Sequence, residues 1–325
     1  MSDRQASPGI SAISFAFPRA SRSVEELGEQ GLLESRPELL REFGFDRVYV
    51  AEEETAFGLA AEAAEHLLRE RSIEPESIDL LLYAGTPGTL AFAPGAEIPT
   101  HGAAFRTTDR FKYPATRLQH ELGLSRAAVI GVEQLACTSL FGAIRLARAV
   151  CIADGVDRVL CVASEFFPAD AGREAIFNCT SDACVALLVE RQATRNRIRS
   201  AVHVSKGYYW DCDARSNEIV ASYFPTSRHV MLRAIEEAGW TPSDIDWILP
   251  HNVSVRSWEI LSGLVRLPNA RLRLENIPRH GHTLAGDNFI TLHDALRAGA
   301  IEEGDRLLLF SYGYGAHWAA LTLEA

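Results

Sequence analysis

A cysteine lies where a predicted strand meets a predicted helix. In the segment EQLACTSLFGAI, the strand ends near Gln134 and the helix begins near Thr138, so Cys137 falls in the turn between them. A thiol at the N-terminus of a helix experiences a partial positive charge, which favours the thiolate form. Cys137 is therefore a candidate nucleophile. The alternative is a buried cysteine with no chemical role.

The remaining cysteines show no metal-binding pattern. The sequence holds six cysteines, no two of them form a CxxC pair, and no histidine lies at zinc-finger spacing from any of them. We therefore expect no structural zinc site, and the sequence carries no signal for a bound metal or cofactor.

Three further segments carry residues suited to acid–base or oxyanion chemistry. His251 follows a buried strand in WILPHNVSVR, at the kind of strand end where catalytic side chains emerge from α/β sheets. His282 and Asp287 lie in RHGHTLAGDN before a predicted helix, where Asp287 could instead be an ordinary N-cap. The turn in YGYGAHW (312–318) could direct a backbone N–H at an oxyanion, or be an ordinary hairpin turn.

Strand-like and helix-like segments alternate along the chain and must position these residues. The predicted helices cover 56–72, 115–122, 140–155, 229–239 and 288–300. The predicted strands cover 78–86, 127–134, 158–166, 183–190, 201–210 and 245–254, with two more in 306–324. This alternation predicts an α/β architecture with buried strands. Segment 191–200 is the best candidate boundary between two halves. The Gly-, Pro- and Thr-rich segment 87–112 is predicted to be a long loop that is either functional or mobile.

Composition and charge argue against several classes of protein. The 325 residues are 47% apolar and 23% charged, which is ordinary for a globular protein. The formal net charge is −11 and the basic residues are scattered, so we expect no nucleic-acid partner. No uninterrupted apolar run approaches the ~18 residues of a membrane span, and the N-terminus has no secretory pattern, so we expect a cytoplasmic protein that does not enter a membrane.

Taken together, the motifs resemble those of ketoacyl-ACP synthase III and the wider thiolase superfamily, in the same order from about residue 9 to the end. Cys137 in LACTS matches the nucleophile motif. His251 in PHNVSVR matches the histidine of PHQAN, and Arg256 matches the arginine five positions on. RHGHTLAGDN is similar to RHGNTSAAS, TSDACVALL is similar to FGDGAGAAVL, and LLLFSYGYGAHWAALTLE is similar to the glycine-rich C-terminal hairpin.

The resemblance implies the thiolase fold, a five-layered α/β/α/β/α stack of two pseudo-repeated halves, normally in a homodimer. The halves would be residues 1–192, which hold the nucleophile and the inserted pocket loop 87–112, and residues 193–325, which hold His251 and the His282/Asp287 loop.

The resemblance also implies a reaction through an acyl-cysteine. Cys137 would accept an acyl group from CoA or an acyl carrier protein, with His251 as the main base. The backbone N–H groups of Cys137 and Tyr314 would be the oxyanion donors.

Two departures from the family pattern bear on the acceptor. His282 replaces the asparagine that helps to hold a malonyl thioester, and Asp287 replaces a small residue. A carboxylate near His251 would orient its imidazole and raise its basicity, which suits deprotonation of an alcohol or an amine. Whether His282 or Asp287 is the third catalytic residue is open at this stage.

Other departures concern the acyl donor. Glu38 and Glu42 align with the tryptophan and arginine that grip CoA in the family, and acidic residues there should repel CoA phosphates. Arg173 aligns, across a gap, with a second arginine that contacts CoA. Arg256 is a further candidate for donor binding, and Tyr113 is expected near an aromatic residue that crosses the family's dimer interface.

Three hypotheses follow. The first is acyl transfer to an oxygen or nitrogen atom of a small-molecule acceptor, in specialised (secondary) metabolism. The second is decarboxylative Claisen condensation, the main reaction of the family. The third is a non-catalytic subunit that supports another chain, which the retained Cys137 disfavours because such subunits commonly lose the nucleophile.

Overall fold

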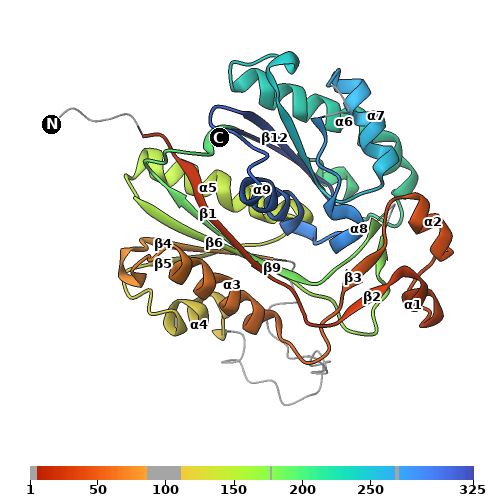
Figure 1. Cartoon of the computed structure of the whole chain (residues 1–325), viewed down its shortest axis with the longest axis horizontal. Coiled ribbons are helices and arrows are strands. Elements are labelled where there is room, and N and C mark those ends of the chain that lie inside the picture. Colours follow the sequence, from red (N-terminus) through yellow and green to blue (C-terminus); the bar gives the residue numbers. More distant parts are fainter. Residues whose placement is uncertain (1–5, 86–110, 176–177, 268–270) are drawn as a thin grey trace.

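The computed structural model describes residues 6–85, 111–175, 178–267 and 271–325 (Figure 1). The predicted pocket loop 87–112 lies outside the described residues except for its last two positions. Nine strands are linked into one sheet in the order β11-β12-β13-β10-β1-β9-β6-β4-β5. The first half contributes β1 (Gly9–Ala16), β4 (Leu80–Gly85), β5 (Ala128–Val132), β6 (Arg158–Glu165) and β9 (Ala183–Glu190). The second half contributes β10 (Arg197–Ser205), β11 (Trp247–Pro250), β12 (Arg306–Gly313) and β13 (His317–Glu324).

The two halves repeat one topology. In the first half, β1 pairs antiparallel with β9, β9 antiparallel with β6, and β6 parallel with β4. In the second half, β10 pairs antiparallel with β13, β13 antiparallel with β12, and β12 parallel with β11. The halves meet where Gly9 of β1 is opposite Arg197 of β10. The boundary that we predicted at 192/193 falls in the connection from β9 to β10.

The longer helices form three layers around these strands. They are α3 (Ala56–Glu70), α4 (Pro114–Glu121), α5 (Ser139–Ala153), α6 (Ser216–Glu237), α7 (Val255–Val265) and α9 (Asp287–Arg297). Helices α5 and α9 lie in the middle, α3 and α4 cover the outer side of the first half, and α6 and α7 cover the outer side of the second (Figure 1). This is the mixed α/β arrangement that the sequence predicts.

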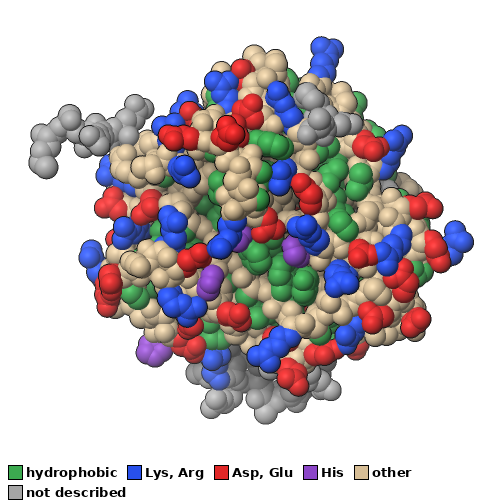
Figure 2. Space-filling model, viewed as in Figure 1, with side chains coloured by type: hydrophobic (Ala, Val, Ile, Leu, Met, Phe, Trp, Pro, Cys, Tyr) green, Lys and Arg blue, Asp and Glu red, His purple; other side chains and the backbone are tan. Residues whose placement is uncertain are grey.

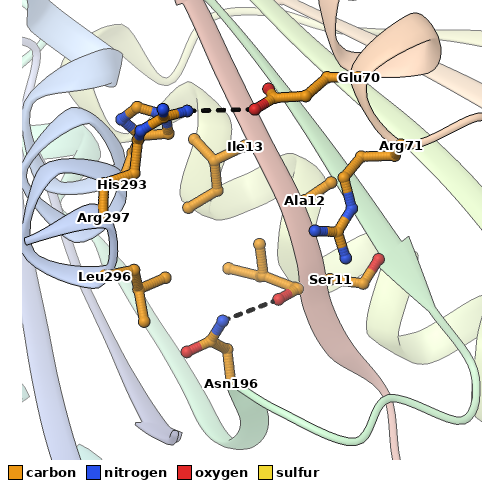
Figure 3. Close-up of a pocket in the computed structure, with 10 residues that line it drawn as sticks. Ser11, Ala12, Ile13, Glu70, Arg71, Asn196, His293, Leu296 and Arg297 are labelled. Atoms are coloured by element: carbon orange, nitrogen blue, oxygen red, sulfur yellow. Dashed lines mark hydrogen bonds and ion pairs between the residues drawn. The ribbon is translucent and has the colours of Figure 1, made fainter. Parts of the chain in front are cut away.

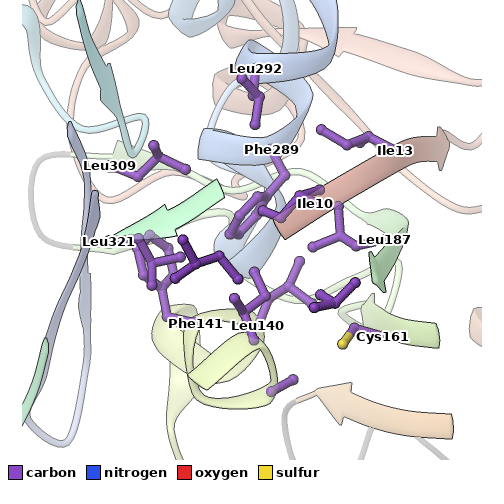
Figure 4. Close-up of a cluster of buried hydrophobic side chains, with 14 of the residues drawn as sticks. Ile10, Ile13, Leu140, Phe141, Cys161, Leu187, Phe289, Leu292, Leu309 and Leu321 are labelled. Carbon is purple, nitrogen blue, oxygen red and sulfur yellow. The ribbon is translucent and has the colours of Figure 1, made fainter. Parts of the chain in front are cut away.

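The central layer is apolar and tightly packed. Phe141 of α5 and Phe289 of α9 have ring centroids 5.3 Å apart, and Leu309 and Leu321 of the second half pack into the same cluster (Figure 4). By length and composition alone, the stretch Ala136–Ala153 would suffice to cross a membrane, and half of it is buried. Because this stretch is α5 and its preceding turn, its apolar character is accounted for by the core.

Smaller elements cover one end of the molecule. They are β2 (Ser21–Ser23), α1 (Val24–Glu29), α2 (Pro37–Glu42), β3 (Arg47–Tyr49), β7 (Glu174–Ala175), β8 (Asn178–Cys179) and α8 (Asn276–His280). On the face shown in Figure 2, acidic and basic side chains are intermixed without a large patch of one sign.

Two predicted elements have bounds that differ from those of the structure. The sequence predicts a helix over 229–239, but α6 begins at Ser216 and includes Pro225. The first half of α6 carries this proline and several polar residues, which conceal its helical periodicity. The predicted strand 201–210 is also shifted, since β10 runs from Arg197 to Ser205 and a 3-10 turn starts at Gly207.

Candidate active site

Cys137 lies in a strained turn between β5 and α5. Gln134 and Ala136 have φ values of 66° and 45°, in the left-handed region that side chains other than glycine rarely adopt. A 3-10 turn (Ala136–Thr138) follows, and the hydroxyl of Thr138 donates a hydrogen bond of 2.7 Å to the carbonyl of Leu135. Such backbone costs of order 1–3 kcal/mol per residue and clusters at functional sites. The turn leaves Cys137 partly exposed at the start of α5.

The glycine hairpin between β12 and β13 packs against this turn. Ser311 donates a hydrogen bond of 3.0 Å to the carbonyl of Cys137. A Cβ atom on Gly313 would lie 2.5 Å from the carbonyl oxygen of Leu135 and 3.2 Å from the amide nitrogen of Cys137. Only glycine allows the hairpin to come this close to the backbone of Leu135 and Cys137. The close contact brings the turn that contains Tyr314 beside the nucleophile. That the N–H groups of Cys137 and Tyr314 stabilise an oxyanion stays a prediction.

Cys137, His282 and Asp287 form a chain of contacts. The Sγ atom of Cys137 lies 3.3 Å from Nε2 of His282, and Nδ1 of His282 lies 2.5 Å from Oδ2 of Asp287. The side chains of His282 and Asp287 are both buried. This is the geometry in which a carboxylate fixes an imidazole so that its second nitrogen can exchange a proton with a nucleophile.

Asp287 is held as a carboxylate by several donors. Its oxygens accept hydrogen bonds from the backbone N–H of Asn252 (2.6 Å), the backbone N–H of Thr283 (2.6 Å) and the hydroxyl of Thr283 (2.7 Å). Burial by itself would raise the pKa of Asp287, but the neighbouring His282 and these donors lower it. Asp287 is thus an acceptor of hydrogen bonds only.

The same interaction keeps a proton on His282. Burial by itself would lower the pKa of the imidazole, but the Asp287 carboxylate and the Cys137 sulfur raise it well above its usual range. His282 can therefore hold the proton that the thiol loses when it becomes a nucleophile.

A loop held by backbone hydrogen bonds positions His282. Its N–H donates to the carbonyl of Cys179 and its carbonyl accepts from the N–H of Ser181, both at 2.8 Å. Gly281 has a φ of 62°, and a Cβ atom there would lie 2.8 Å from the carbonyl oxygen of Cys179. The 3-10 turn η7 (Leu284–Gly286) then brings Asp287 back to the imidazole.

The expected pairing of Asp287 with His251 is wrong. Both ring nitrogens of His251 lack a hydrogen-bond partner in the part of the chain that the structure describes, although the residue is fully buried. Its ring packs against Trp258 and Phe310, each at a centroid distance of 5.6 Å, and lies 6.2 Å from the ring of His282. Burial, followed by the effect of His282, lowers the pKa of His251 to about 3, so its imidazole is neutral.

The structure therefore places the thiol in contact with a different histidine from the one that we expected to act as its base. The match of its motif to the family's histidine motif predicts His251 as the main base. His282, which aligns with an asparagine, is the histidine in contact with the thiol. Sequence spacing alone does not reveal this, because side-chain direction depends on the backbone of Gly281 and of the following turn.

The predicted donor-binding residues lie in different environments. Arg173 is fully buried and its guanidinium binds both carboxylate oxygens of Asp182, at 2.7 and 3.2 Å. This corrects the expectation that Arg173 contacts the donor, since its charge is already paired inside the protein. Arg256 is exposed near the start of α7 and pairs with Glu259 at 2.6 Å. Tyr113 is exposed at the start of α4.

The acidic helix α2 lies next to this part of α7. The carbonyl of Phe43, the residue that caps α2, accepts a hydrogen bond of 2.9 Å from the N–H of Val255. Glu38 and Glu42 are both exposed on α2. The surface near Arg256 therefore carries charges of both signs.

A separate pocket lies away from the nucleophile. It has a volume of about 150 Å³ and is bordered by β1, the C-terminal ends of α3 and α9, and Asn196 (Figure 3). Arg297 and Glu70 form an ion pair of 3.1 Å across it. Helix α9 begins at Asp287 and ends at Arg297, so this pocket lies at the opposite end of that helix from Cys137, His282 and Asp287. Among the described residues, no group of three or more His, Cys, Asp or Glu side chains is arranged to hold a metal ion.

Comparisons with known proteins agree with the predicted fold. The C-terminal domain of the 3-oxoacyl-[acyl-carrier-protein] synthase III family matches residues 235–325. Beta-ketoacyl-[acyl-carrier-protein] synthase III from Aquifex aeolicus is 26% identical over 85% of this chain and 86% of its own length.

Solved structures extend the similarity over nearly the whole chain. The crystal structure of 3-oxoacyl-[acyl-carrier-protein] synthase III from Aquifex aeolicus superposes with a TM-score of 0.80 at 21% identity, over 98% of this chain and 100% of that one. The acyltransferase ChlB3 superposes with a TM-score of 0.81 at 20% identity, over 98% of both chains. The chain is therefore similar to ketoacyl-ACP synthase III over nearly its whole length, in sequence and in fold.

Proposed function

We propose that this enzyme transfers an acyl group, through an acyl-Cys137 intermediate, to an oxygen or nitrogen atom of a small-molecule acceptor in specialised metabolism. The observation that supports the proposal best is the buried chain from Cys137 through His282 to Asp287. A histidine oriented by a carboxylate is suited to removing a proton from an alcohol or amine. Breaking a carbon–carbon bond does not require such a base.

In the first half-reaction, the Cys137 sulfur attacks the carbonyl carbon of a thioester donor. A new carbon–sulfur bond forms, the bond to the donor sulfur breaks, and the proton held by His282 goes to the leaving thiolate. In the second half-reaction, Nε2 of His282 takes the proton of the acceptor as its oxygen or nitrogen attacks the acyl carbon. The bond to Cys137 then breaks and restores the starting pair.

His251 supports both half-reactions as a neutral group. Its low pKa means that it carries no charge at neutral pH, and its nitrogens have no partner among the residues described. One ring N–H is therefore available to donate a hydrogen bond to a substrate oxygen.

Decarboxylative condensation is the second candidate. Relatives such as the Aquifex aeolicus protein are named as beta-ketoacyl-[acyl-carrier-protein] synthases. His282, which contacts Cys137, and His251 have ring centroids 6.2 Å apart and could together bind the carbonyl of a malonyl thioester. The structural neighbour ChlB3, which is described as an acyltransferase, favours the first candidate.

Surface features support a proposal for the donor and for the assembly. We propose an acyl carrier protein as the donor rather than CoA, because Glu38 and Glu42 are exposed where CoA phosphates would meet negative charge. We also propose a cytoplasmic homodimer joined at β5. This strand is an edge of the sheet, and Ile130 on it is 42% exposed.

Intact-protein mass spectrometry tests the proposal. The wild type should gain the mass of the acyl group from acyl carrier protein thioesters, and Cys137→Ala should gain none. Addition of an alcohol or amine acceptor should remove that mass as an ester or amide. If a malonyl donor instead releases carbon dioxide and yields a ketoacyl product, condensation is the correct function.

A further inference from the structure

A histidine from the second half contacts the residue that follows the nucleophile. Nε2 of His203, on β10, lies 3.3 Å from the hydroxyl oxygen of Thr138. The side chain of Thr138 is fully buried, whereas Cys137 before it is partly exposed. His203 therefore lies one residue away from the nucleophile, although it belongs neither to the motif around Cys137 nor to the contacts through His282.

The direction of this hydrogen bond follows from the second contact of Thr138. The hydroxyl carries one proton, and its bond of 2.7 Å to the Leu135 carbonyl uses that proton. In the longer contact the hydroxyl oxygen therefore accepts and Nε2 of His203 donates. Burial, followed by the effects of His317 and Arg145, lowers the pKa of His203 to about 4, so its imidazole is neutral at pH 7 and carries a single N–H. That N–H is the one directed at Thr138.

The nucleophile turn depends on such contacts because part of its backbone is strained. Gln134 and Ala136 both have positive φ values, of 66° and 45°. Strained backbone persists only where the surrounding structure holds it in place. The Thr138 hydroxyl ties the start of α5 to the carbonyl of Leu135, inside the strained segment, and His203 holds this hydroxyl from β10.

The contact of His203 also joins the two halves of the fold beside the thiol. Helix α5 belongs to the first half and β10 to the second. Further along α5, Nε of Arg148 donates to the carbonyl of Ile198 on β10 at 3.3 Å, so the helix and the strand are linked at two points. A shift of α5 relative to β10 would move the Cys137 sulfur relative to His282, which lies in the second half at 3.3 Å from it.

We propose that His203 is a positioning residue for the nucleophile. Its N–H holds the Thr138 hydroxyl and thereby fixes the distance and direction between the Cys137 thiol and His282. The inference rests on the proposed acyl-cysteine chemistry and adds a residue that supports it. Because a proton passes from sulfur to nitrogen only at hydrogen-bond distance, a small displacement of the turn lowers the rate at which the thiol attacks.

The test compares His203→Phe, which removes the N–H, with His203→Gln, whose NH₂ group can replace it. Two reactions are followed by mass and assigned to Cys137 by peptide mass: acyl loading from an acyl carrier protein, and alkylation by iodoacetamide, which needs no acyl donor. We expect both rates to fall about tenfold in His203→Phe and to recover in His203→Gln. The donor concentration for half-maximal loading should stay unchanged, since His203 acts on the turn and not on the donor.

Thr138 offers the same test from the other partner. Thr138→Ser keeps the hydroxyl and should react at nearly the wild-type rate, whereas Thr138→Val removes it and should lose about tenfold. In the Thr138→Val background, His203→Phe should cause no further loss, because the contact is already absent. If His203→Phe does not fold, the comparison of Thr138→Ser with Thr138→Val decides, and equal rates in these two variants would overturn the proposal.

His66→Phe is the matched control. His66 of α3 also contacts a hydroxyl, that of Ser14 at 3.1 Å, but α3 lies on the outer side of the first half, so this variant should react as the wild type does. Wild-type rates in His203→Phe, or equal losses in His203→Phe and His203→Gln, would overturn the assignment. A wild type that is alkylated by iodoacetamide but accepts no acyl group would instead contradict the acyl-cysteine proposal, so the two failures are distinguishable.

Discussion

At the scale of single residues, the mechanism depends on which histidine exchanges a proton with the thiol of Cys137. Sequence motifs identify Cys137, both histidines and Asp287 as candidates, but they do not show how the four are paired. The pairing depends on the positive φ of Gly281 and on a turn that returns Asp287 to the imidazole of His282. These are properties of the folded loop, and residue spacing does not report them.

Asp287→Asn should impair transfer more than loading. The amide carries no charge to stabilise protonated His282, and its NH₂ group would oppose the N–H donors of Asn252 and Thr283. We expect a loss of about a hundredfold or more in the rate at which the acyl group leaves Cys137. Single-turnover mass spectrometry measures this rate.

Asp294→Asn provides the control for that variant. Asp294 also lies on α9 and also contacts a histidine, His293, at 3.2 Å, but it is not part of the catalytic chain. It should transfer at the wild-type rate. Equal losses in the two variants would assign Asp287 a structural role only.

His251→Phe should make the protein more resistant to acid. The folded-state pKa of His251, about 3, is below the unfolded value of about 6.5, so the unfolded chain binds an extra proton between these values. Stability therefore falls as pH decreases from 6.5 towards 3, by up to about 1.4 kcal/mol per unit. Phenylalanine removes this contribution.

Urea unfolding at pH 7, 6 and 5 measures the effect. The wild type should lose more unfolding free energy over this range than His251→Phe does, since Trp258 and Phe310 already surround the ring with apolar atoms. Parallel losses in the two proteins would show that His251 is not held neutral.

At the scale of elements, the hairpin from β12 to β13 positions the nucleophile turn. Its glycine-rich sequence predicts a tight turn, but the contact of Gly313 with the Leu135 carbonyl joins residues far apart in the chain and requires the fold. The same limit explains α6, where Pro225 conceals a helix that packing against β13 and β10 stabilises.

Gly313→Ala should abolish or strongly reduce acyl loading. Its methyl group would lie 2.5 Å from a backbone oxygen, so the hairpin or the Cys137 turn must move. A shift of this kind typically costs about a hundredfold in rate. Gly263→Ala on α7 is the control, because a Cβ atom there meets no atom within 4 Å. Normal loading by Gly313→Ala would mean that this approach is not needed for catalysis.

At the scale of the whole molecule, the alternating strands and helices in the sequence predict the α/β class and the repeated halves. The sequence does not show that β1 and β10 link the halves into one sheet, because that pairing joins segments nearly 190 residues apart. Nor does hydropathy alone show that β5, although apolar, is exposed at the edge of the sheet.

Ile130→Lys should separate the proposed dimer. A lysine on an exposed edge strand opposes pairing with a second copy and is tolerated in the monomer. Light scattering at micromolar concentration should give twice the monomer mass for the wild type and one monomer mass for the variant. Val220→Lys on α6, which is also partly exposed, should remain dimeric. A monomeric wild type would contradict the proposed assembly.

The most direct test of the central claim compares the loading rates of His282→Gln and His251→Gln. Acyl transfer from an acyl carrier protein to Cys137 is followed by intact mass in each variant and in the wild type. Because the thiol contacts His282, whereas the ring nitrogens of His251 have no partner among the described residues, His282→Gln should fail to load while His251→Gln still gains the acyl mass. Loading by His282→Gln together with failure of His251→Gln would contradict the account and would restore His251 as the base.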